Sequence, residues 1–200
     1  MSRASVRRDT LTLEEIVEAA RRLIRRDGLA SFSMRAVAKE LGVATMTTYT
    51  HVSSKDELIR VVQEAVSHEW APIELTDDGW EAGLRRFLLS QWETYQRYPG
   101  LAAWYMQRPE FGTKPETYSA WIAFFTKAGF NPRDAELAWS VSQTYLMGRL
   151  AVDARLGHGR STRSGPGLRA REYVERGVEV IITGIRETSV IEAGRHPKQR

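Results

Sequence analysis

The sequence predicts an all-α fold with two helical parts, and three observations lead to this prediction. Apolar residues recur every three or four positions along most of the chain, which is the periodicity of amphipathic helices. Capping residues stand before several of these stretches, and glycine or proline follows them. No segment of convincing length alternates apolar with polar residues, and no internal repeat is present.

The first predicted helix begins after Thr12, because Thr12 and Glu15 have the spacing of a capping box. Apolar residues then recur at helical spacing up to Gly28, a residue type that suits the positive φ of a helix C-terminus. The second helix is short, with Ser33 as its expected N-cap and Gly42 at its end.

A third short helix is predicted over about Thr45–Thr50. Ser54 and Glu57 have the spacing of a second capping box, and they open a longer helix. Pro72 and the polar stretch Thr76–Gly79 then mark a boundary. We expect this longer helix to connect the first part of the chain with the second and to act as a lever between them.

The second part of the chain is predicted to consist of helices with wide apolar faces. Pro115 and Pro132 suit the first turns of two of them. Gly157–Gly167 contains four glycines and a proline, so we expect a loop there. The predicted helices cover about residues 80–98, 101–106, 115–128, 132–156 and 168–188.

The composition excludes several classes of protein. The 200 residues contain no cysteine, which excludes disulfide scaffolds, thiolate metal sites and a cysteine nucleophile and fits a reducing cytoplasm. No apolar run approaches the roughly 20 residues needed to span a bilayer. The N-terminus has no apolar segment of a secretory signal. With 42% hydrophobic and 27% charged residues, the chain is typical of a globular protein.

The segment Ser33–Lys55 has the pattern of a helix-turn-helix, with two short helices joined through Leu41-Gly42-Val43. Gly42 allows a sharp turn, and the neighbouring apolar residues hold the two helices together. The outer face of the second helix is then available to the major groove of DNA. Its side chains can reach bases or phosphates: Thr45, Met46, Thr47, Tyr49 and His51.

Lys55 lies in the first turn of the next helix, where a positive charge opposes the helix dipole. This position is explained if Lys55 and nearby backbone amides bind a phosphate together. The alternative interpretation is an ordinary solvent-exposed lysine.

The combined spacing over Thr12–Val62, about a quarter of the chain, resembles the DNA-binding domain of the TetR family of bacterial transcriptional regulators. The matching residues are Ser33-Met34-Arg35 with Val37-Ala38, Leu41-Gly42-Val43, Tyr49-x-His51-Val52 and Lys55-x-x-Leu58. The resemblance implies an all-helical second domain for ligand binding and dimerisation. It also implies double-stranded DNA as a partner, contacted by Ser33, Arg35, Thr45, Met46, Thr47, Tyr49, His51 and Lys55.

The resemblance divides the chain into a basic disordered arm at residues 1–11, a DNA-binding domain at 12–66, a ligand-binding and dimerisation domain at 67–190, and a disordered tail at 191–200. Ala44 departs from the family pattern because a capping serine is usual there, and Thr48 replaces a large aliphatic residue. Four threonines lower the helix propensity of this segment, so we expect the recognition helix to be mobile without DNA.

Positive charge is concentrated near the N-terminus. Residues 1–60 contain 11 Lys+Arg and 8 Asp+Glu, and they carry +3 of the formal net charge of +4. Arg3, Arg7 and Arg8 form a basic arm, which is either an auxiliary DNA contact or a solvated terminus.

Aromatic residues are dense between Trp80 and Trp139. Ordinary core packing is the main alternative for each of them, but polar side chains interrupt the apolar faces, as in small-molecule sites. Arg149 and Asp153 are expected to be a surface or interface pair. The predicted effector-binding residues are Phe87, Gln91, Tyr95, Trp121, Phe125, Gln143 and Met147.

An enzyme is the first alternative class. The chain has no HExxH motif, glycine-rich phosphate loop or GxSxG elbow, and its four histidines lack the i,i+4 spacing of a helical metal site. We therefore expect no catalytic residue, no metal site and no cofactor.

The preferred interpretation is a homodimeric repressor that a hydrophobic or aromatic small molecule releases from a pseudo-palindromic operator, with no membrane partner. The last two long helices have apolar faces that can form a four-helix interface between two copies. The second alternative is a DNA-binding regulator without a small-molecule ligand, whose C-terminal domain serves only dimerisation.

Overall fold

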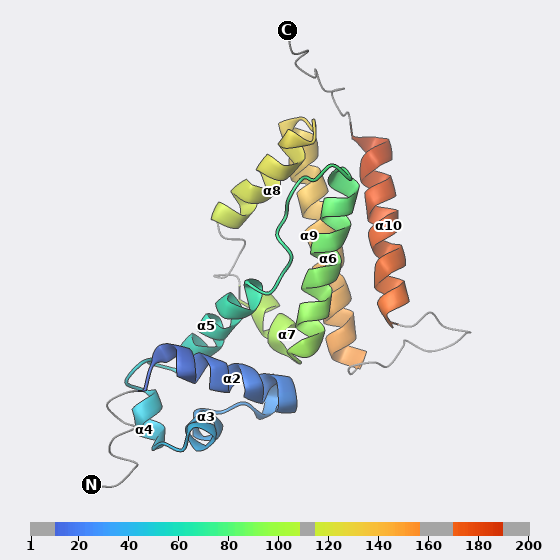
Figure 1. Ribbon diagram of the computed structural model, residues 1–200. Coiled ribbons are helices and arrows are strands. Elements are labelled where there is room, and N and C mark those ends of the chain that lie inside the picture. The colour runs from blue at the N-terminus through green and yellow to red at the C-terminus, as the bar shows by residue number, and fades with distance from the viewer. Residues whose placement is uncertain (1–10, 109–114, 157–169, 190–200) are drawn as a thin grey trace. The chain divides into compact units, whose positions relative to one another are not determined.

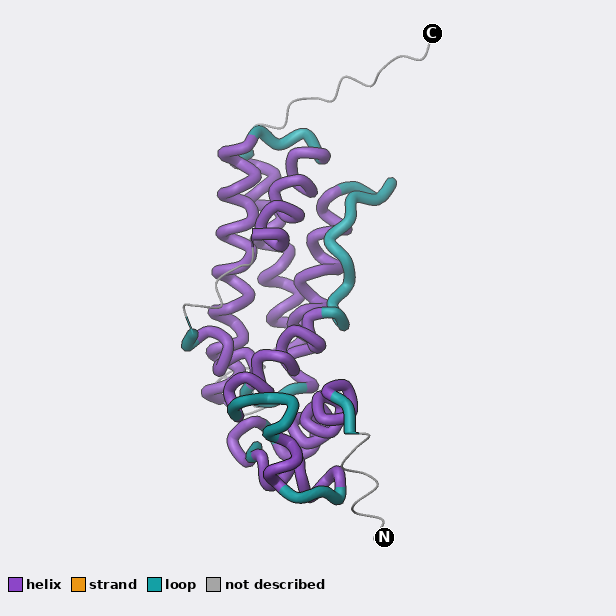
Figure 2. Tube along the Cα trace, turned by 90° about the vertical axis from the view of Figure 1, so that its left-hand side faces the viewer, coloured by secondary structure: helices purple, strands orange, loops and turns teal. Residues whose placement is uncertain are grey.

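The computed structural model describes residues 11–108, 115–156 and 170–189, and these residues form helices connected by loops and turns (Figure 1). No strand occurs among them, and the tube in Figure 2 shows only helices and loops. An isolated bridge joins Thr76 and Gly79. The all-α prediction is therefore confirmed. The predicted arm, glycine-rich loop and tail lie outside the described residues, apart from Leu11 at the end of the arm.

The chain divides into two compact units. The first unit comprises residues 1–70 and 93–105, and the second comprises residues 71–92 and 106–200. The helices of the first unit are α2 (Leu13–Asp27), η1 (Leu29–Ser31), α3 (Met34–Leu41), α4 (Thr45–Thr48), α5 (Lys55–Ser67) and α7 (Leu101–Met106), whose last residue belongs to the second unit. Those of the second are α8 (Pro115–Lys127), α9 (Pro132–Leu156) and α10 (Ala170–Thr188).

Helix α6 (Trp80–Arg97) is divided between the two units, because the boundary falls between Trp92 and Glu93. Helix α5 lies entirely inside the first unit, whereas α6 contains residues of both units, and the expectation that α5 acts as a lever stays a prediction. Sequence periodicity shows where a helix starts and ends, but not which neighbours it packs against.

Local capping signals fix the ends of α2 and α3. Thr12 and Glu15 form the predicted capping box, with Thr12 N donating to Glu15 Oε2 at 2.9 Å and Glu15 N donating to Thr12 Oγ1 at 3.2 Å. Gly28 adopts φ +74° after α2. Ser33 caps α3 by accepting a hydrogen bond from Ala36 N at 3.2 Å.

The core of the first unit is aliphatic. Helix α2 packs on α3 and α5, and its apolar positions are one to four residues apart, so they share one face. The buried residues of these helices include Ile16, Ala20, Leu23, Ile24, Val37, Leu58, Ile59 and Val62.

The core of the second unit is aromatic. Trp80, Phe124, Phe125 and Phe130 are buried and in ring contact, for example Trp80 with Phe130 at 5.1 Å between centroids. Gly83 is needed on α6, because a Cβ there would lie 2.5 Å from the Glu74 carbonyl oxygen and 3.0 Å from the Phe124 ring.

Candidate nucleic-acid interface

The turn of the helix-turn-helix depends on Gly42, which adopts the left-handed conformation with φ +69° and ψ 31°. Gly42 N donates to Lys39 O at 3.2 Å, and Val43 N donates to Ala38 O at 3.0 Å. These bonds close the end of α3 and direct the chain into α4. An open groove of about 380 Å³ lies along the turn and is lined by Arg35, Ala36, Ala38, Lys39, Val43, Ala44 and Thr45.

Helix α4 begins at Thr45, and the N-cap residue Ala44 provides no side-chain cap, as the sequence predicts. It ends at Thr48 rather than near Thr50, because the following amides bond three residues back; Tyr49 N, for example, donates to Met46 O at 3.2 Å. Thr48 is fully buried, and its hydroxyl donates to Thr45 O at 2.7 Å. A polar residue is therefore accommodated where the family pattern has an aliphatic one.

The exposed face of α4 differs from the prediction at one residue. Met46 is 74% exposed and Tyr49 is also exposed, as are Thr50 and His51 after the helix. Thr47, however, is only 6% exposed, because four residues form little more than one turn and α4 turns this side toward the core. Thr47 therefore does not lie on the outer face with Met46, and its DNA contact stays a prediction.

Lys55 begins α5 with an exposed side chain, and its Nζ lies 5.8 Å from the centroid of the Phe32 ring. The predicted capping box is only half formed: Ser54 Oγ accepts from Glu57 N at 3.0 Å, but the Glu57 carboxylate accepts from Ser53 N at 2.6 Å and from the Ser53 hydroxyl. These bonds lower the pKa of Glu57. The backbone amides of Ser53 and Glu57, two positions from Lys55 on either side, therefore already donate hydrogen bonds within the chain. A bound phosphate would depend more on the Lys55 ammonium group than the sequence suggests.

Basic side chains remain exposed along this face of the first unit. Arg35 and Lys39 on α3 are exposed, as is Lys55. The acidic Glu40 is drawn toward α2 instead, where it lies 3.4 Å from both Arg22 and Arg26. The face that carries the predicted DNA contacts therefore keeps its positive charge, which favours contact with phosphate groups.

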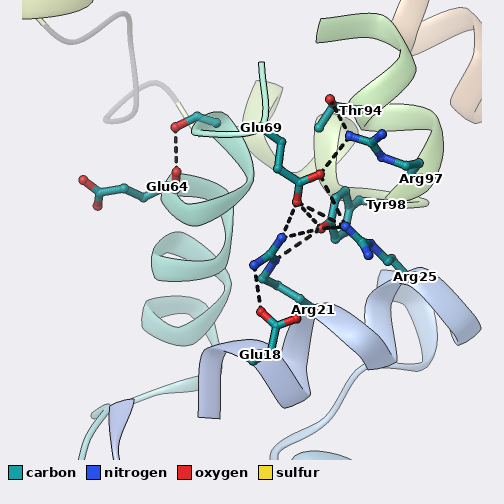
Figure 3. A network of polar contacts seen from close by, with 9 residues as sticks. Glu18, Arg21, Arg25, Glu64, Glu69, Thr94, Arg97 and Tyr98 are labelled. Atoms are coloured by element: carbon teal, nitrogen blue, oxygen red, sulfur yellow. Dashed lines mark hydrogen bonds and ion pairs between the residues drawn. The ribbon is translucent and has the colours of Figure 1, made fainter. Parts of the chain in front are cut away.

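A polar cluster centred on Glu69 connects three segments of the first unit (Figure 3). Arg21 and Arg25 of α2 and Arg97 of α6 all form ion pairs with the Glu69 carboxylate, which follows α5. Tyr98 donates a hydrogen bond to Glu69 and accepts one from Arg25 at 2.6 Å. We call these five residues the Glu69 cluster.

The Glu69 cluster keeps its central carboxylate ionised. Burial tends to raise the pKa of Glu69, but hydrogen bonds from Tyr98 and Arg21, together with the charges of Arg21 and Arg25, outweigh burial and lower that pKa. Burial and the neighbouring Glu69 charge raise the pKa of Tyr98. At neutral pH, Glu69 is therefore a fixed negative charge among three arginines.

A backbone contact joins the end of α2 to the corner between α6 and α7. Leu29 N donates to Pro99 O at 2.8 Å. Gly100 adopts φ +88°, and a Cβ there would lie 3.1 Å from Leu29 Cβ. This corner and the Glu69 cluster together attach the end of α6 to the helix-turn-helix within one compact unit.

The predicted effector residues do not all fall in the same unit. Phe87, Gln91, Trp121, Phe125, Gln143 and Met147 belong to the second unit, whereas Tyr95 belongs to the first. Tyr95 is buried there, and its hydroxyl accepts a hydrogen bond from Gln63 Nε2 at 2.8 Å. Because Tyr95 belongs to the first unit and the other six candidates to the second, we leave Tyr95 out of the candidate effector site.

The remaining effector candidates lie in or near the aromatic core. Phe87 meets Trp121 edge to face at 4.8 Å, and Trp121 stacks on Phe125 at 5.9 Å. Met147 is half-buried on α9. Gln91 Oε1 and Gln143 Nε2 are buried without a hydrogen-bond partner in the described part of the chain. Trp139 Nε1 is also buried without a hydrogen-bond partner among the described residues. Sequence reasoning missed Trp139, because no pattern in the sequence distinguishes it from the other tryptophans.

Arg149 and Asp153 form a half-buried pair rather than an exposed surface pair, and the other half of the expectation, an interface pair, stays a prediction. Their side chains are 16% and 12% exposed, and Arg149 Nε donates to Asp153 Oδ1 at 3.0 Å. Trp92 Nε1 donates to Asp153 Oδ2 at 2.9 Å. Helical spacing predicts the pair, but only the tertiary structure decides that it is half-buried and bonded to Trp92 of α6.

The described residues contain no group of three or more His, Asp or Glu side chains that could hold a metal ion. Across the same residues, no helix combines the length and hydropathy that crossing a bilayer requires.

Comparison with known proteins places the helix-turn-helix in a family. Residues 16–62 match the model described as "Bacterial regulatory proteins, tetR family". The HTH-type transcriptional repressor DrrR1 of Streptomyces coeruleorubidus is 38% identical over 104 residues, which are 52% of this chain and 38% of that repressor. The match thus spans well under half of this relative's length. An HTH-type transcriptional regulator of Saccharopolyspora erythraea is 27% identical over 91% of this chain and 87% of its own length.

The fold extends the similarity beyond the helix-turn-helix. The crystal structure of the Streptomyces coelicolor TetR family protein ActR in complex with actinorhodin superposes with a TM-score of 0.73. The match covers 90% of this chain and 97% of that one at 21% sequence identity. Both the N-terminal and the C-terminal helices therefore follow a fold already seen in solved structures.

Proposed function

The chain belongs to the TetR family of bacterial regulatory proteins, and from this premise we propose that it is a homodimeric repressor released from a pseudo-palindromic operator by a hydrophobic or aromatic small molecule. The observation that carries the proposal is the exposed face of α4 and its neighbours in a chain with a DNA-binding domain of this family. Met46 projects from that face, and basic side chains flank it.

The DNA contacts follow from the exposure of these side chains. Recognition helices enter the major groove with their N-terminal residues at base edges, so we assign Thr45 and Met46 to bases and Arg35 to a base or phosphate. Tyr49, His51 and Lys55 lie further along the face and suit phosphates. Ser33 contributes by capping α3, which holds Arg35 in the first turn.

Exposed apolar residues on α9 and α10 support a dimer. Val180 is 70% exposed on α10, and Tyr173 on the same helix is also exposed. Leu137, Val141 and Val152 are exposed on α9. A Cβ at Gly148 or Gly184 would meet no atom within 4 Å, so a partner helix could approach closely there. Two such helices from each copy can form a four-helix interface.

The aromatic second unit supports binding of a small molecule. In some dimer conformations, the spacing of the two DNA-binding domains does not match the two half-sites of the operator. A ligand that binds these conformations more tightly increases their population and so releases the operator. ActR, a protein with the same fold, has been solved in complex with actinorhodin, which supports binding of a small molecule by this chain.

Selection of bound sequences from random double-stranded DNA tests the proposal. We expect an enriched site with two inverted half-sites about one helical turn apart, bound by two copies of the chain in analytical ultracentrifugation. Enrichment of a single half-site, bound by one copy, would contradict the dimer. Absence of any enriched sequence would contradict the proposal that the chain regulates transcription by binding a specific DNA site.

A thermal-shift screen of hydrophobic compounds tests the effector separately. A binding compound raises the melting temperature with concentration. It should also weaken operator binding if the two sites are coupled. A compound that binds tightly and leaves operator affinity unchanged would contradict release by that compound.

A further inference from the structure

Two nitrogen atoms on α9 are buried without a hydrogen-bond partner among the described residues. They are Trp139 Nε1 and Gln143 Nε2. The two residues are four positions apart, so they lie on one face of the helix and one turn from each other. A neighbouring polar group on α9 is paired, because Ser142 Oγ donates to Ala138 O at 2.7 Å.

A third unpartnered atom lies on α6. Gln91 is 3% exposed, and its Oε1 has no partner in the described structure. Phe87 lies one turn before Gln91, so the two side chains share a face of α6.

Helix α8 brings these two faces to one aromatic layer. Tyr118 on α8 meets the Trp139 ring edge to face, with 5.0 Å between centroids. Trp121, three residues later on the same side of α8, meets Phe87 in the same way at 4.8 Å. Phe87 of α6 and Trp139 of α9 therefore meet rings on the same side of α8, and Gln91 and Gln143 each lie one helical turn from one of them. All six residues belong to the second unit.

Buried polar groups in native proteins are almost always hydrogen-bonded, so three unpartnered atoms around one layer indicate a partner from outside the chain. The indole N–H of Trp139 can only donate, so that partner must offer an acceptor, whatever the orientation of the glutamine amides. The surrounding rings favour a flat aromatic molecule.

We propose that Trp139, Gln143 and Gln91 are the polar part of the effector site, and that the effector is a flat aromatic carbonyl compound. Its carbonyl oxygen accepts from Trp139 and Gln143, and a hydroxyl group on its ring donates to Gln91. This inference rests on the proposed effector response of the second unit. It adds Trp139 as a residue that selects for a carbonyl oxygen.

A matched pair of probes tests the acceptor requirement. 9-Fluorenone and fluorene have the same flat ring system, but only fluorenone carries a carbonyl oxygen. By isothermal titration of the full chain, we expect fluorenone to bind at least about fivefold more tightly than fluorene, the effect of one net hydrogen bond or more. In Trp139→Phe, which keeps an aromatic ring and removes the N–H, this preference should fall, because only Gln143 can still donate to the carbonyl oxygen. An unchanged preference would overturn the role of Trp139.

Trp104→Phe is the control for the probe experiment. Trp104 lies in the first unit, where its Nε1 donates to Asp56 Oδ1 at 3.4 Å, so this variant should keep the preference for fluorenone. Equal binding of both probes to the native chain would overturn the carbonyl requirement but would still agree with an aromatic effector. Binding of neither probe would also overturn the inference. The operator selection tests separately whether the chain is a DNA-binding regulator.

Stability without any ligand gives a second test. Trp92→Phe removes an N–H that donates to Asp153, so it should lower the melting temperature. Trp139→Phe loses a similar amount of ring packing but removes an N–H without a partner, so it should lower the melting temperature less than Trp92→Phe does. An equal loss in both variants would show that the Trp139 N–H is already satisfied inside the protein, for example by a buried water, and would overturn the inference.

Discussion

The two compact units treat their buried polar groups differently. In the first unit, Glu69 collects three arginines and a tyrosine hydroxyl, and Tyr95 accepts from Gln63. In the second unit, Gln91, Trp139 and Gln143 leave polar atoms unpartnered beside aromatic rings. Each unpartnered group costs about 1–3 kcal/mol. The first unit is not free of such atoms, because Gln63 Oε1 is also unpartnered among its described residues. The two units therefore differ in that the first gathers most of its polar groups around Glu69, whereas the described part of the second has three polar side chains with unpartnered atoms beside aromatic rings.

The largest expected effect comes from overfilling the second unit. In Gly83→Ala, the new Cβ would lie 2.5 Å from the backbone oxygen of Glu74, which cannot rotate away as a side chain can. We expect a loss of about 1–3 kcal/mol in the free energy of unfolding, measured by denaturant titration. Thr126→Ala is the control, because Thr126 is exposed on α8 and lies outside the proposed dimer interface. Equal stability of the two variants would mean that the core around α6 is loosely packed.

Removing the central charge of the first unit comes next. Glu69→Gln keeps the size of the side chain but leaves three arginines around a neutral amide. We expect a loss of roughly 1–2 kcal/mol in unfolding free energy, reduced by the partial exposure of the arginines. Glu64→Gln is the control, since Glu64 forms an exposed pair with Arg60 at 3.8 Å and should matter little. A loss in Glu69→Gln no greater than in the control would contradict a stabilising Glu69 cluster.

The Glu69 carboxylate also makes the stability of the folded chain depend on pH. The pKa of Glu69 is lower in the folded chain than its ordinary value of 4.5. Its stabilising effect is therefore complete above the unfolded pKa and is lost as the pH falls through the folded pKa. The melting temperature of the native chain should fall more steeply below about pH 5 than that of Glu69→Gln. Parallel curves for the two proteins would rule out this contribution.

A smaller effect is expected at the DNA face. Lys55→Ala should weaken binding similarly across DNA sequences and reduce the slope of log affinity against log salt by about one. The measurement is fluorescence anisotropy with the selected operator at several salt concentrations. Lys127→Ala, an exposed lysine at the end of α8, is the control and should leave the slope unchanged. An unchanged slope in Lys55→Ala would show that Lys55 does not meet a phosphate.

The smallest effect concerns the uncapped start of α4. Ala44 is in the extended conformation of an N-cap but offers no side-chain oxygen. Ala44→Ser should therefore raise the unfolding free energy by about 0.5–1 kcal/mol. Ala30→Ser is the control: Ala30 is an exposed residue of η1 and is not an N-cap, so this change should leave the unfolding free energy unchanged. Equal changes in the two variants would show that α4 gains nothing from a cap.

The sequence by itself determined the features that depend on near neighbours. The capping box of Thr12 and Glu15, the cap at Ser33 and the left-handed turn at Gly42 involve residues a few positions apart, so their geometry follows from residue type and spacing. For the same reason, residue type and spacing alone predict the helix-turn-helix.

Only the tertiary structure decided the features that depend on distant contacts. Glu69 meets Arg21 from 48 positions away, Thr47 turns inward, and the boundary between the units falls inside α6. Trp139 could not be singled out from the sequence, because whether an indole N–H has a partner depends on which helices surround it. Periodicity assigns a residue to a face, whereas packing decides what that face meets.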